Sequence, residues 1–245
     1  MTVAGEHAEE AIAAMLDLFP EGFAEGRRGG AVELVAFTEE AGAELLRERF
    51  GDVESQPVSS GWEEEWKRFH RAVEVGPLWI GPPWQRPAAG LEAVVIDPGR
   101  AFGTGGHSTT LLCVELLVDL DRGSVLDVGC GSGILAIAAA KLGFAPVLAI
   151  DSDEAAVEAA TRNAAANDAA VGVRLLDAAS DALPSAEIVL ANIDLRTIEL
   201  LAPPSECKML VTSGYYEQDR PSFEGFARMA RKIEAEWAAD LFERQ

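Results

Sequence analysis

Cysteine is scarce in this chain of 245 residues, and long hydrophobic runs are absent. Its three cysteines, Cys113, Cys130 and Cys207, are too few and too scattered for a disulfide framework or a zinc cluster, so we expect reduced thiols and no metal site. No run approaches the roughly 18 consecutive apolar residues of a membrane helix. The first residues, MTVAGEHAEEA, are acidic where a signal peptide is basic. We therefore expect a cytoplasmic protein that does not bind membranes.

Basic residues are also scarce, because 20 Lys and Arg residues stand against 41 Asp and Glu residues and leave a net charge of −21. The acidic excess is spread along the chain, so no part is a basic platform. A protein that neutralises many phosphates gathers Lys and Arg on one face, and tight binding to nucleic acid is therefore not expected. A lysine-rich protein is an easier partner, although acidity that serves solubility alone would give the same composition.

The strongest pattern lies at residues 125–151, VLDVGCGSGILAIAAAKLGFAPVLAID. Residues 125–128 predict a buried parallel strand, a glycine-rich turn follows, and residues 134–142 favour a helix. Residues 147–150 predict a second strand that ends at Asp151. Glycines let the backbone approach a ligand, and the first turn of the helix offers unpaired N–H groups. The stretch is therefore typical of half a nucleotide-binding unit.

The spacing of Gly129, Gly131 and Gly133 discriminates between nucleotides. The dinucleotide fingerprint would place a glycine at Ile134, and a phosphate-binding P-loop would place a lysine there. Asp127, just before the turn, would repel a pyrophosphate but suits a ligand with an amino group and a sulfonium. The pattern resembles the first motif of class I S-adenosylmethionine-dependent methyltransferases, which implies S-adenosyl-L-methionine as the cofactor.

Acidic residues end the second and third predicted strands. Asp151 is placed to accept both hydroxyls of a ribose; alternatively it only caps the next helix, but Ser152 and Asp153 are better placed for capping. Asp177 follows the third strand and is a candidate for reading the adenine amino group, a role for which Asp181 competes.

A fourth predicted strand, residues 188–191, ends at Asn192. Ligands of open α/β sheets lie beyond the carboxyl ends of the strands, so we expect Gly129, Asp151, Asp177 and Asn192 to line one crevice. The fold class is therefore α/β, with a Rossmann-like, mixed seven-stranded sheet. Its remaining predicted elements are strands at 93–96, 209–213 and 237–242 and a helix at 223–232.

The chain before this domain predicts two further parts. Residues 1–60 read as a small α+β domain, close to ferredoxin-like but short at its start, because only residues 1–4 could supply a first strand. Residues 61–92 contain four of the five tryptophans and several prolines, which indicates a packed linker, or alternatively an aromatic platform for substrate. The catalytic domain would span residues 93–245. The elements predicted in the first part are helices at 6–19 and 39–50 and strands at 23–27, 31–37 and 53–58.

A second glycine-rich turn, GTGGHSTT, occupies residues 103–110. Ser108 or Thr109 opens a predicted helix, and His107 stands at the mouth of the turn. A lone histidine is usually structural, but its place just upstream of the first strand of the nucleotide-binding unit favours a functional role.

With DPGRAFGTGGHSTT, DVGCGSG, Asp151 and LANI at 190–193, the chain resembles the family of methyltransferases that modify large-subunit ribosomal protein eleven. The resemblance runs from about Trp62 to Trp237 and includes WEEEWKRF and LWIGPPW. It implies a substrate-recognition domain, a connecting segment and a class I catalytic domain that methylates lysine side chains and an α-amino group of the ribosomal protein. It also implies that S-adenosyl-L-methionine contacts Thr110, Gly129, Asp151 and Asn192.

Two features depart from the family pattern. The recognition domain is shortened at its start, which leaves another protein or a small amine open as the acceptor. Ile193-Asp194-Leu195 follows Asn192 where the family usually continues with Leu-Ala. This departure adds a carboxylate to the rim of the acceptor pocket, where it either attracts an ammonium or caps the next helix.

The implied reaction needs little from the protein beyond position, because a methyl group on a sulfonium is already activated. Asn192 is the candidate to orient the neutral amine, and His107 or solvent would take the proton. The rival amino-methyltransferases of adenine or glutamine use Asn-Pro-Pro-Tyr, whose aromatic is missing after Asn192. A rival of another class is a catalytically silent S-adenosylmethionine-binding module.

We therefore expect a monomeric protein-lysine N-methyltransferase. The candidate catalytic residues are Asn192 and His107. The candidate residues for S-adenosyl-L-methionine are Thr110, Asp127, Gly129, Gly131, Gly133, Asp151, Asp177 and Asn192.

Overall fold

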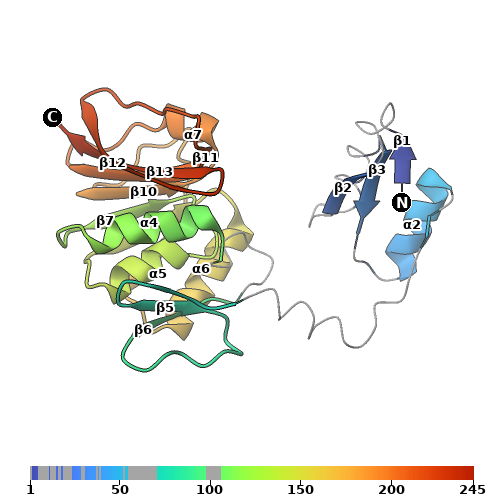
Figure 1. The fold of residues 1–245 in the computed structure, drawn as a ribbon, viewed down its shortest axis with the longest axis horizontal. Coiled ribbons are helices and arrows are strands. Elements are labelled where there is room, and N and C mark those ends of the chain that lie inside the picture. The colour runs from blue at the N-terminus through green and yellow to red at the C-terminus, as the bar shows by residue number, and fades with distance from the viewer. Residues whose placement is uncertain are drawn as a thin grey trace. The chain divides into compact units, whose positions relative to one another are not determined.

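A computed structural model describes residues 2–4, 11, 15, 18, 24–28, 31–36, 38, 40–51, 53–54, 71–97 and 106–245. The chain divides into two compact units, Met1–Glu63 and Glu64–Gln245 (Figure 1). The motif WEEEWKRF and residues 98–105, which include the start of the second glycine-rich turn, lie outside the described residues. No helix in the described part of the chain is long and apolar enough to cross a membrane.

The first unit combines a small sheet with helical segments. Ala11, Met15 and Leu18 are helical, and Ala11 and Met15 pack with side chains of the sheet and of helix α2 (Glu40–Phe50). Val53 and Glu54 are not in a strand, and the rest of the strand predicted at 53–58 lies outside the described residues. The sheet is antiparallel in the order β1-β3-β2, with β1 (Thr2–Ala4), β2 (Ala24–Arg28) and β3 (Ala31–Val35).

The second unit is built on a mixed seven-stranded sheet, as predicted, and its strand order is β12-β13-β11-β10-β7-β8-β9. The strands from β11 to β9 run parallel, and β13 pairs antiparallel with both β11 and β12. Their bounds are β7 (Val125–Val128), β8 (Val147–Asp151), β9 (Val171–Leu175), β10 (Ile188–Asn192), β11 (Met209–Tyr216), β12 (Phe226–Glu234) and β13 (Trp237–Arg244).

Helices cover both faces of this sheet (Figure 1). Buried side chains of α4, α5 and α6 share one apolar core, and Ile198 of α7 belongs to a second core on the other face. Strands β7 and β10 are buried on both sides and are mainly apolar; the exceptions are Asp127 within β7 and Asn192 at the end of β10. The helices are α4 (Ser108–Val118), α5 (Ile134–Lys141), α6 (Glu154–Ala166) and α7 (Leu195–Leu200).

Two predictions about the large sheet are wrong. The strand expected at 93–96 does not join it: β6 (Glu92–Val95) pairs with β5 (Leu78–Gly81), which pairs with β4 (Val73–Val75) in a separate sheet. Leu78 and Ile80, expected in a linker, are buried in the same core as α4 and α5. The segment 71–97 therefore belongs to the structure of the second unit.

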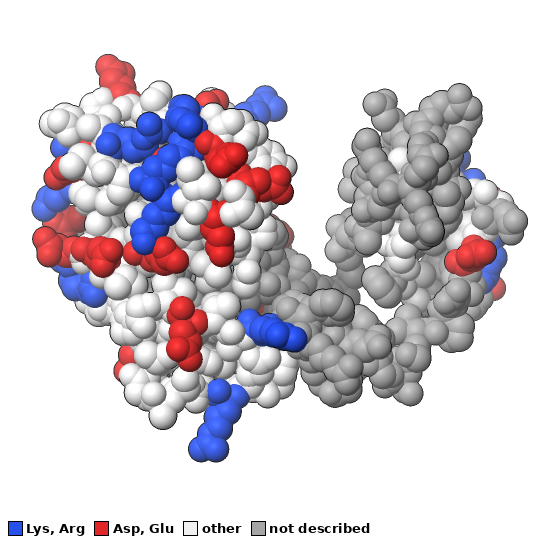
Figure 2. Space-filling model, viewed as in Figure 1, with Lys and Arg blue, Asp and Glu red and all other residues white. Residues whose placement is uncertain are grey.

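The helix expected at 223–232 is instead strand β12. Its sequence, FARMARKIE, is rich in good helix formers, but hydrogen bonding to β13 across the turn at Ala235 overrides that preference. Figure 2 shows Lys and Arg side chains gathered in a stripe over this end of the sheet. Part of this charge is neutralised within the protein, since Lys232 pairs with Glu115 at 2.7 Å and Arg231 lies 3.4 Å from buried Asp240.

Gly214 allows strand β11 to approach the end of β10 closely. The register of β11 against β13 shifts between Ser213 and Tyr215, and Gly214 has a φ of +100°. A Cβ atom at this position would clash with the backbone carbonyl of Ile193, whose N–H donates to the carbonyl of Ser213 at 3.2 Å. The position directly after Asn192 is thus fixed by a contact that only glycine permits.

Asp127 is a carboxylate inside the core, only 1% exposed. It accepts the N–H of Ala136 at 3.1 Å and so ties strand β7 to helix α5 below the glycine-rich turn. Burial raises the pKa of Asp127 to about 7; the Ala136 bond opposes this rise and nearby Asp151 adds to it. The folded state therefore favours a protonated Asp127.

Replacing Gly214 by alanine is expected to lower the free energy of unfolding by at least about 3 kcal/mol, because it adds a backbone clash to left-handed strain. Gly225→Ala is the matched control: its φ is +75°, but nothing lies within 4 Å of the added Cβ. It should lose only about 1–2 kcal/mol. Urea denaturation of both variants measures these two losses in the free energy of unfolding. Equal losses would contradict the clash, because β10 would then move away from a side chain at position 214 at no further cost.

Asp127→Asn should change the pH dependence of stability. An unfolded aspartate has a pKa near 4, so the stabilisation from protonated Asp127 is complete below about pH 4 and is lost as pH rises through about 7. Asparagine keeps an oxygen for Ala136 but does not titrate. The free energy of unfolding of the variant minus that of the wild type should rise by about 1.4 kcal/mol per pH unit between about pH 4 and 7. Urea titrations across this range test it, and a constant difference would contradict a raised pKa.

Candidate functional site

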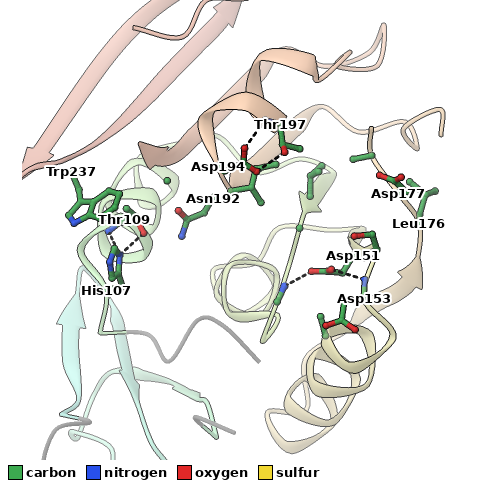
Figure 3. A pocket seen from close by; sticks show the side chains of 18 residues that line it. His107, Thr109, Asp151, Asp153, Leu176, Asp177, Asn192, Asp194, Thr197 and Trp237 are labelled. Carbon is green, nitrogen blue, oxygen red and sulfur yellow. Dashed lines mark hydrogen bonds between the residues drawn. The ribbon is translucent and has the colours of Figure 1, made fainter. Parts of the chain in front are cut away.

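A pocket opens where the carboxyl ends of the parallel strands meet (Figure 3). Its volume is about 660 Å³, within the range of small-molecule sites. The lining residues come from segments that follow four parallel strands and from three elements at the side. They are Val128, Gly129 and Gly131 after β7; Asp151, Ser152, Asp153 and Ala156 after β8; Leu176, Asp177 and Ala178 after β9; Asn192, Ile193, Asp194 and Thr197 after β10; and His107, Thr109, Gly214 and Trp237.

The glycine-rich turn is held against its neighbours. Gly129 has a φ of +67°, and a Cβ there would overlap the side chain of Ile193. Gly133 has a φ of +80° and lies against the backbone of Ala160 in α6. Gly129 and Gly131 line the pocket, whereas Gly133 does not and serves the packing of α5 on α6. A backbone without side chains thus forms part of the pocket wall.

Asp151 is oriented by two backbone N–H groups, from Gly131 at 2.9 Å and Asp153 at 3.0 Å, one on each carboxylate oxygen. It does not cap helix α6: the N-cap is Asp153, which accepts the N–H of Ala155 at 2.9 Å. Each carboxylate oxygen has a second lone pair. Asp151 can therefore accept further hydrogen bonds from a ligand in the pocket.

Asp177 lines the pocket, and its competitor Asp181 does not. Asp177 accepts the N–H of Ala179 at 2.9 Å and the hydroxyl of Ser180 at 3.1 Å. Asp181 instead accepts the N–H of Asp177 at 3.2 Å, which closes the turn after β9. Of the two acids, Asp177 is the one available to a ligand.

Asn192 ends strand β10 and points into the pocket (Figure 3). Its amide nitrogen donates to the hydroxyl of Thr110 at 3.2 Å. Thr110 is 1% exposed and lies outside the lining, as does Asp127. The sequence suggested both residues as direct ligand contacts. In the structure Thr110 is instead placed to orient Asn192, and Asp127 is placed to orient helix α5.

His107 and Trp237 form an aromatic wall beside Asn192 (Figure 3). His107 is the N-cap of α4, with Nδ1 accepting the N–H of Thr109 at 3.3 Å, and its ring meets Trp237 edge-on at 5.0 Å. Tyr216 stacks on Trp237 at 4.7 Å. Trp237 was not predicted as a site residue, because the helix predicted at 223–232 concealed the β12–β13 hairpin. An aromatic residue at the start of the last predicted strand was the available signal.

The pocket is lined by acids without a basic counterpart: four aspartates and no Lys or Arg belong to its lining. Asp194, the fourth, caps α7 by accepting the N–H of Thr197 at 3.0 Å and its hydroxyl at 2.6 Å. These bonds, the hydroxyl first, lower the pKa of Asp194, so it is ionised at neutral pH. Such a pocket disfavours phosphates and favours cations. Among the described residues, no three His, Cys, Asp or Glu side chains gather as metal ligands would.

Comparison with known proteins gives a consistent result. A family model described as ribosomal protein L11 methyltransferase (PrmA) matches residues 31–217. Ribosomal protein L11 methyltransferase of Pelobacter propionicus is 40% identical over 209 residues, which cover 76% of this chain and 67% of that protein. The protein of the same name from Myxococcus xanthus is 36% identical over 221 residues, which cover 82% of this chain and 75% of that protein.

A solved structure is also similar. The ribosomal protein L11 methylase of Lactobacillus delbrueckii subsp. bulgaricus matches with a TM-score of 0.63 and 28% identity, covering 72% of this chain and 100% of that chain. The sheet order and the pocket at the strand ends agree with a class I methyltransferase fold. The chain is a methyltransferase and belongs to the ribosomal protein L11 methyltransferase family.

Proposed function

We propose that this protein transfers methyl groups from S-adenosyl-L-methionine to lysine side chains and the α-amino group of ribosomal protein L11. The observation that carries the proposal is the pocket itself, which sets Asp151, Asp177 and Asn192 at the carboxyl ends of the parallel strands β8, β9 and β10. In this proposal the protein acts as a cytoplasmic monomer, needs no nucleic acid, and uses the first unit to recognise the ribosomal protein.

The residues of the pocket fit this cofactor. Its sulfonium and amino group are cationic, which suits a lining of four aspartates without Lys or Arg, whereas a pyrophosphate would be repelled. Asp151 would accept the ribose hydroxyls, and Leu176, Asp177 and Ala178 would surround the adenine. The backbone at Gly129 and Gly131 would lie against the amino-acid portion.

The chain's own task in the reaction is to hold the acceptor. The cofactor, when bound, supplies an activated methyl group. Asn192 would orient a neutral amine through its amide oxygen, since the amide nitrogen is engaged with Thr110. Asn192 would direct the lone pair of the amine nitrogen toward the methyl group, water would take the amine proton, and the cofactor would leave as a neutral thioether that keeps the electron pair of the broken carbon–sulfur bond. Unperturbed lysine has a pKa near 10.4, and the apolar surroundings of Trp237 would lower it.

His107 contributes to the acceptor wall in this proposal. Nδ1 of His107 caps α4 by accepting the N–H of Thr109, and the His107 ring contacts Trp237. These two contacts support a positioning role for the ring. A proton relay through Nε2 would be an additional task.

Methyl transfer to ribosomal protein L11 is the expected activity. Incubation of ribosomal proteins with the enzyme and isotopically labelled S-adenosyl-L-methionine, followed by mass spectrometry, should find label on lysine and α-amino nitrogen of L11. Unmodified L11 is needed as the substrate, because natural L11 can already carry methyl groups. Label on another protein or on a small amine would move the assignment to that acceptor, and no transfer to any amine would contradict the proposal.

Asn192→Ala should separate catalysis from cofactor binding. We expect turnover to fall by about 100-fold or more, because the amine loses its orienting group, with cofactor affinity within about threefold of the wild type. Asp151→Ala is the matched variant at the end of strand β8 and should lose mainly cofactor affinity. Calorimetry and steady-state kinetics give both quantities. Equal loss of turnover and affinity in Asn192→Ala would refute its role.

A further inference from the structure

The proposed function gives no task to Asp194, although this carboxylate lines the pocket. Asp151 is assigned to the sugar, Asp177 to the adenine, and Asp153 caps the long helix α6. Asp194 caps only α7, a short helix of six residues. Uncharged serine, threonine and asparagine cap helices as well as aspartate does. Capping alone therefore does not require a negative charge at this position.

The location of Asp194 is fixed by the same contacts that fix Asn192. Both residues follow strand β10, and Ile193 between them is confined by Gly129 on one side and Gly214 on the other. Thr197 then holds both oxygens of Asp194, one through its N–H and one through its hydroxyl. Figure 3 shows Asp194 on the wall between Asn192 and the side of the pocket where Asp151 and Asp177 lie. The carboxylate is thus held at a defined place rather than on a mobile side chain.

In the proposed function, this part of the wall would face the sulfur of the cofactor. In S-adenosyl-L-methionine the sulfur is bonded to the ribose, and its methyl group must face the acceptor at Asn192. If Asp151 holds the sugar, the sulfur would lie between Asp151 and Asn192, toward the stretch of wall that carries Asp194. The charge on that sulfur is permanent until the methyl group leaves. The product, S-adenosyl-L-homocysteine, has a neutral sulfur and is otherwise almost the same shape.

We propose that the Asp194 carboxylate selects S-adenosyl-L-methionine over S-adenosyl-L-homocysteine by the charge on sulfur, an inference that rests on the proposed function. Shape and hydrogen bonding cannot separate the two ligands strongly, because the sugar, the adenine and the amino-acid group are common to both. An ionic attraction acts on the charged ligand and is absent for the neutral one. Transfer of the methyl group thus removes one attraction that held the cofactor, and the product exchanges more readily for a new cofactor molecule.

Asp194→Asn tests the inference by binding alone, without any acceptor. Asparagine keeps the cap on α7 and removes the charge. Calorimetry should show that affinity for S-adenosyl-L-methionine falls by about threefold to tenfold, while affinity for S-adenosyl-L-homocysteine stays within about twofold. Asp194→Ser, a second neutral cap, should behave in the same way and covers the case in which the asparagine variant is poorly folded. Thermal unfolding of each variant verifies that α7 remains in place.

Asp153→Asn is the matched control, because it removes the same charge from another helix cap on the lining of the same pocket. It should change the ratio of the two affinities by less than about twofold. Equal weakening of both ligands by the Asp194 variants, no weakening of either, or an equal change of the ratio in Asp153→Asn would overturn the inference. A wild-type protein that binds neither ligand would overturn the proposed function as well, whereas normal binding with an unchanged ratio would overturn this inference alone.

Discussion

The confinement of Ile193 between two glycines is the constraint on which the site depends. Strand β10 lies between β7 and β11 in the sheet, and both neighbours carry a glycine where β10 ends. A side chain at Gly129 would overlap Ile193, and one at Gly214 would strike its carbonyl. Close packing therefore leaves one position for the backbone on either side of Ile193. The contact of Ile193 with the two glycines therefore fixes the positions of Asn192 and Asp194. One of these glycines, Gly129, belongs to the glycine-rich turn.

Backbone N–H groups at helix N-termini and in tight turns stabilise the carboxylates of the pocket, so these acids do not need Lys or Arg side chains as partners. Each aspartate on the lining accepts local backbone N–H groups: Asp153 and Asp194 cap helices, Asp177 closes a turn, and Asp151 holds the glycine-rich turn. These donors satisfy carboxylates that would otherwise need Lys or Arg. Asp127 shows the contrast, because it is fully enclosed with one such bond and burial raises its pKa. Asp194 differs from Asp127, because the hydroxyl and the N–H of Thr197 lower its pKa.

Local patterns in the sequence predicted the centre of this fold well and its borders poorly. Residues 125–151 contain their own strand, turn and helix signals, and the structure reproduces them as β7, α5 and β8. Partner choice is a long-range property, so the sequence did not reveal that β6 joins a small sheet or that residues 226–234 pair with β13. Trp237 and Gly214 line the pocket from segments distant in the sequence and were missed for the same reason. Thr110 was expected at the ligand from the family resemblance, and Asp127 from its charge beside the glycine-rich turn. A strand and a helix that are buried on several sides give no alternation that would have shown where these two side chains point.

The two walls of the pocket meet opposite electrostatic demands of amine methylation. Carboxylates favour a cationic ligand, but they also favour the protonated amine, which cannot react. In this protein Asp151, Asp177 and Asp194 lie toward one side, while Trp237 and His107 line the other, with Asn192 between them (Figure 3). In the proposed function the sulfonium occupies the acidic side, and the amine enters between aromatic rings. There the apolar surroundings and the positive sulfur both lower the pKa of the amine. Separation of charge from apolar surface within one pocket thus allows an acidic protein to bind a cation and still deprotonate its acceptor.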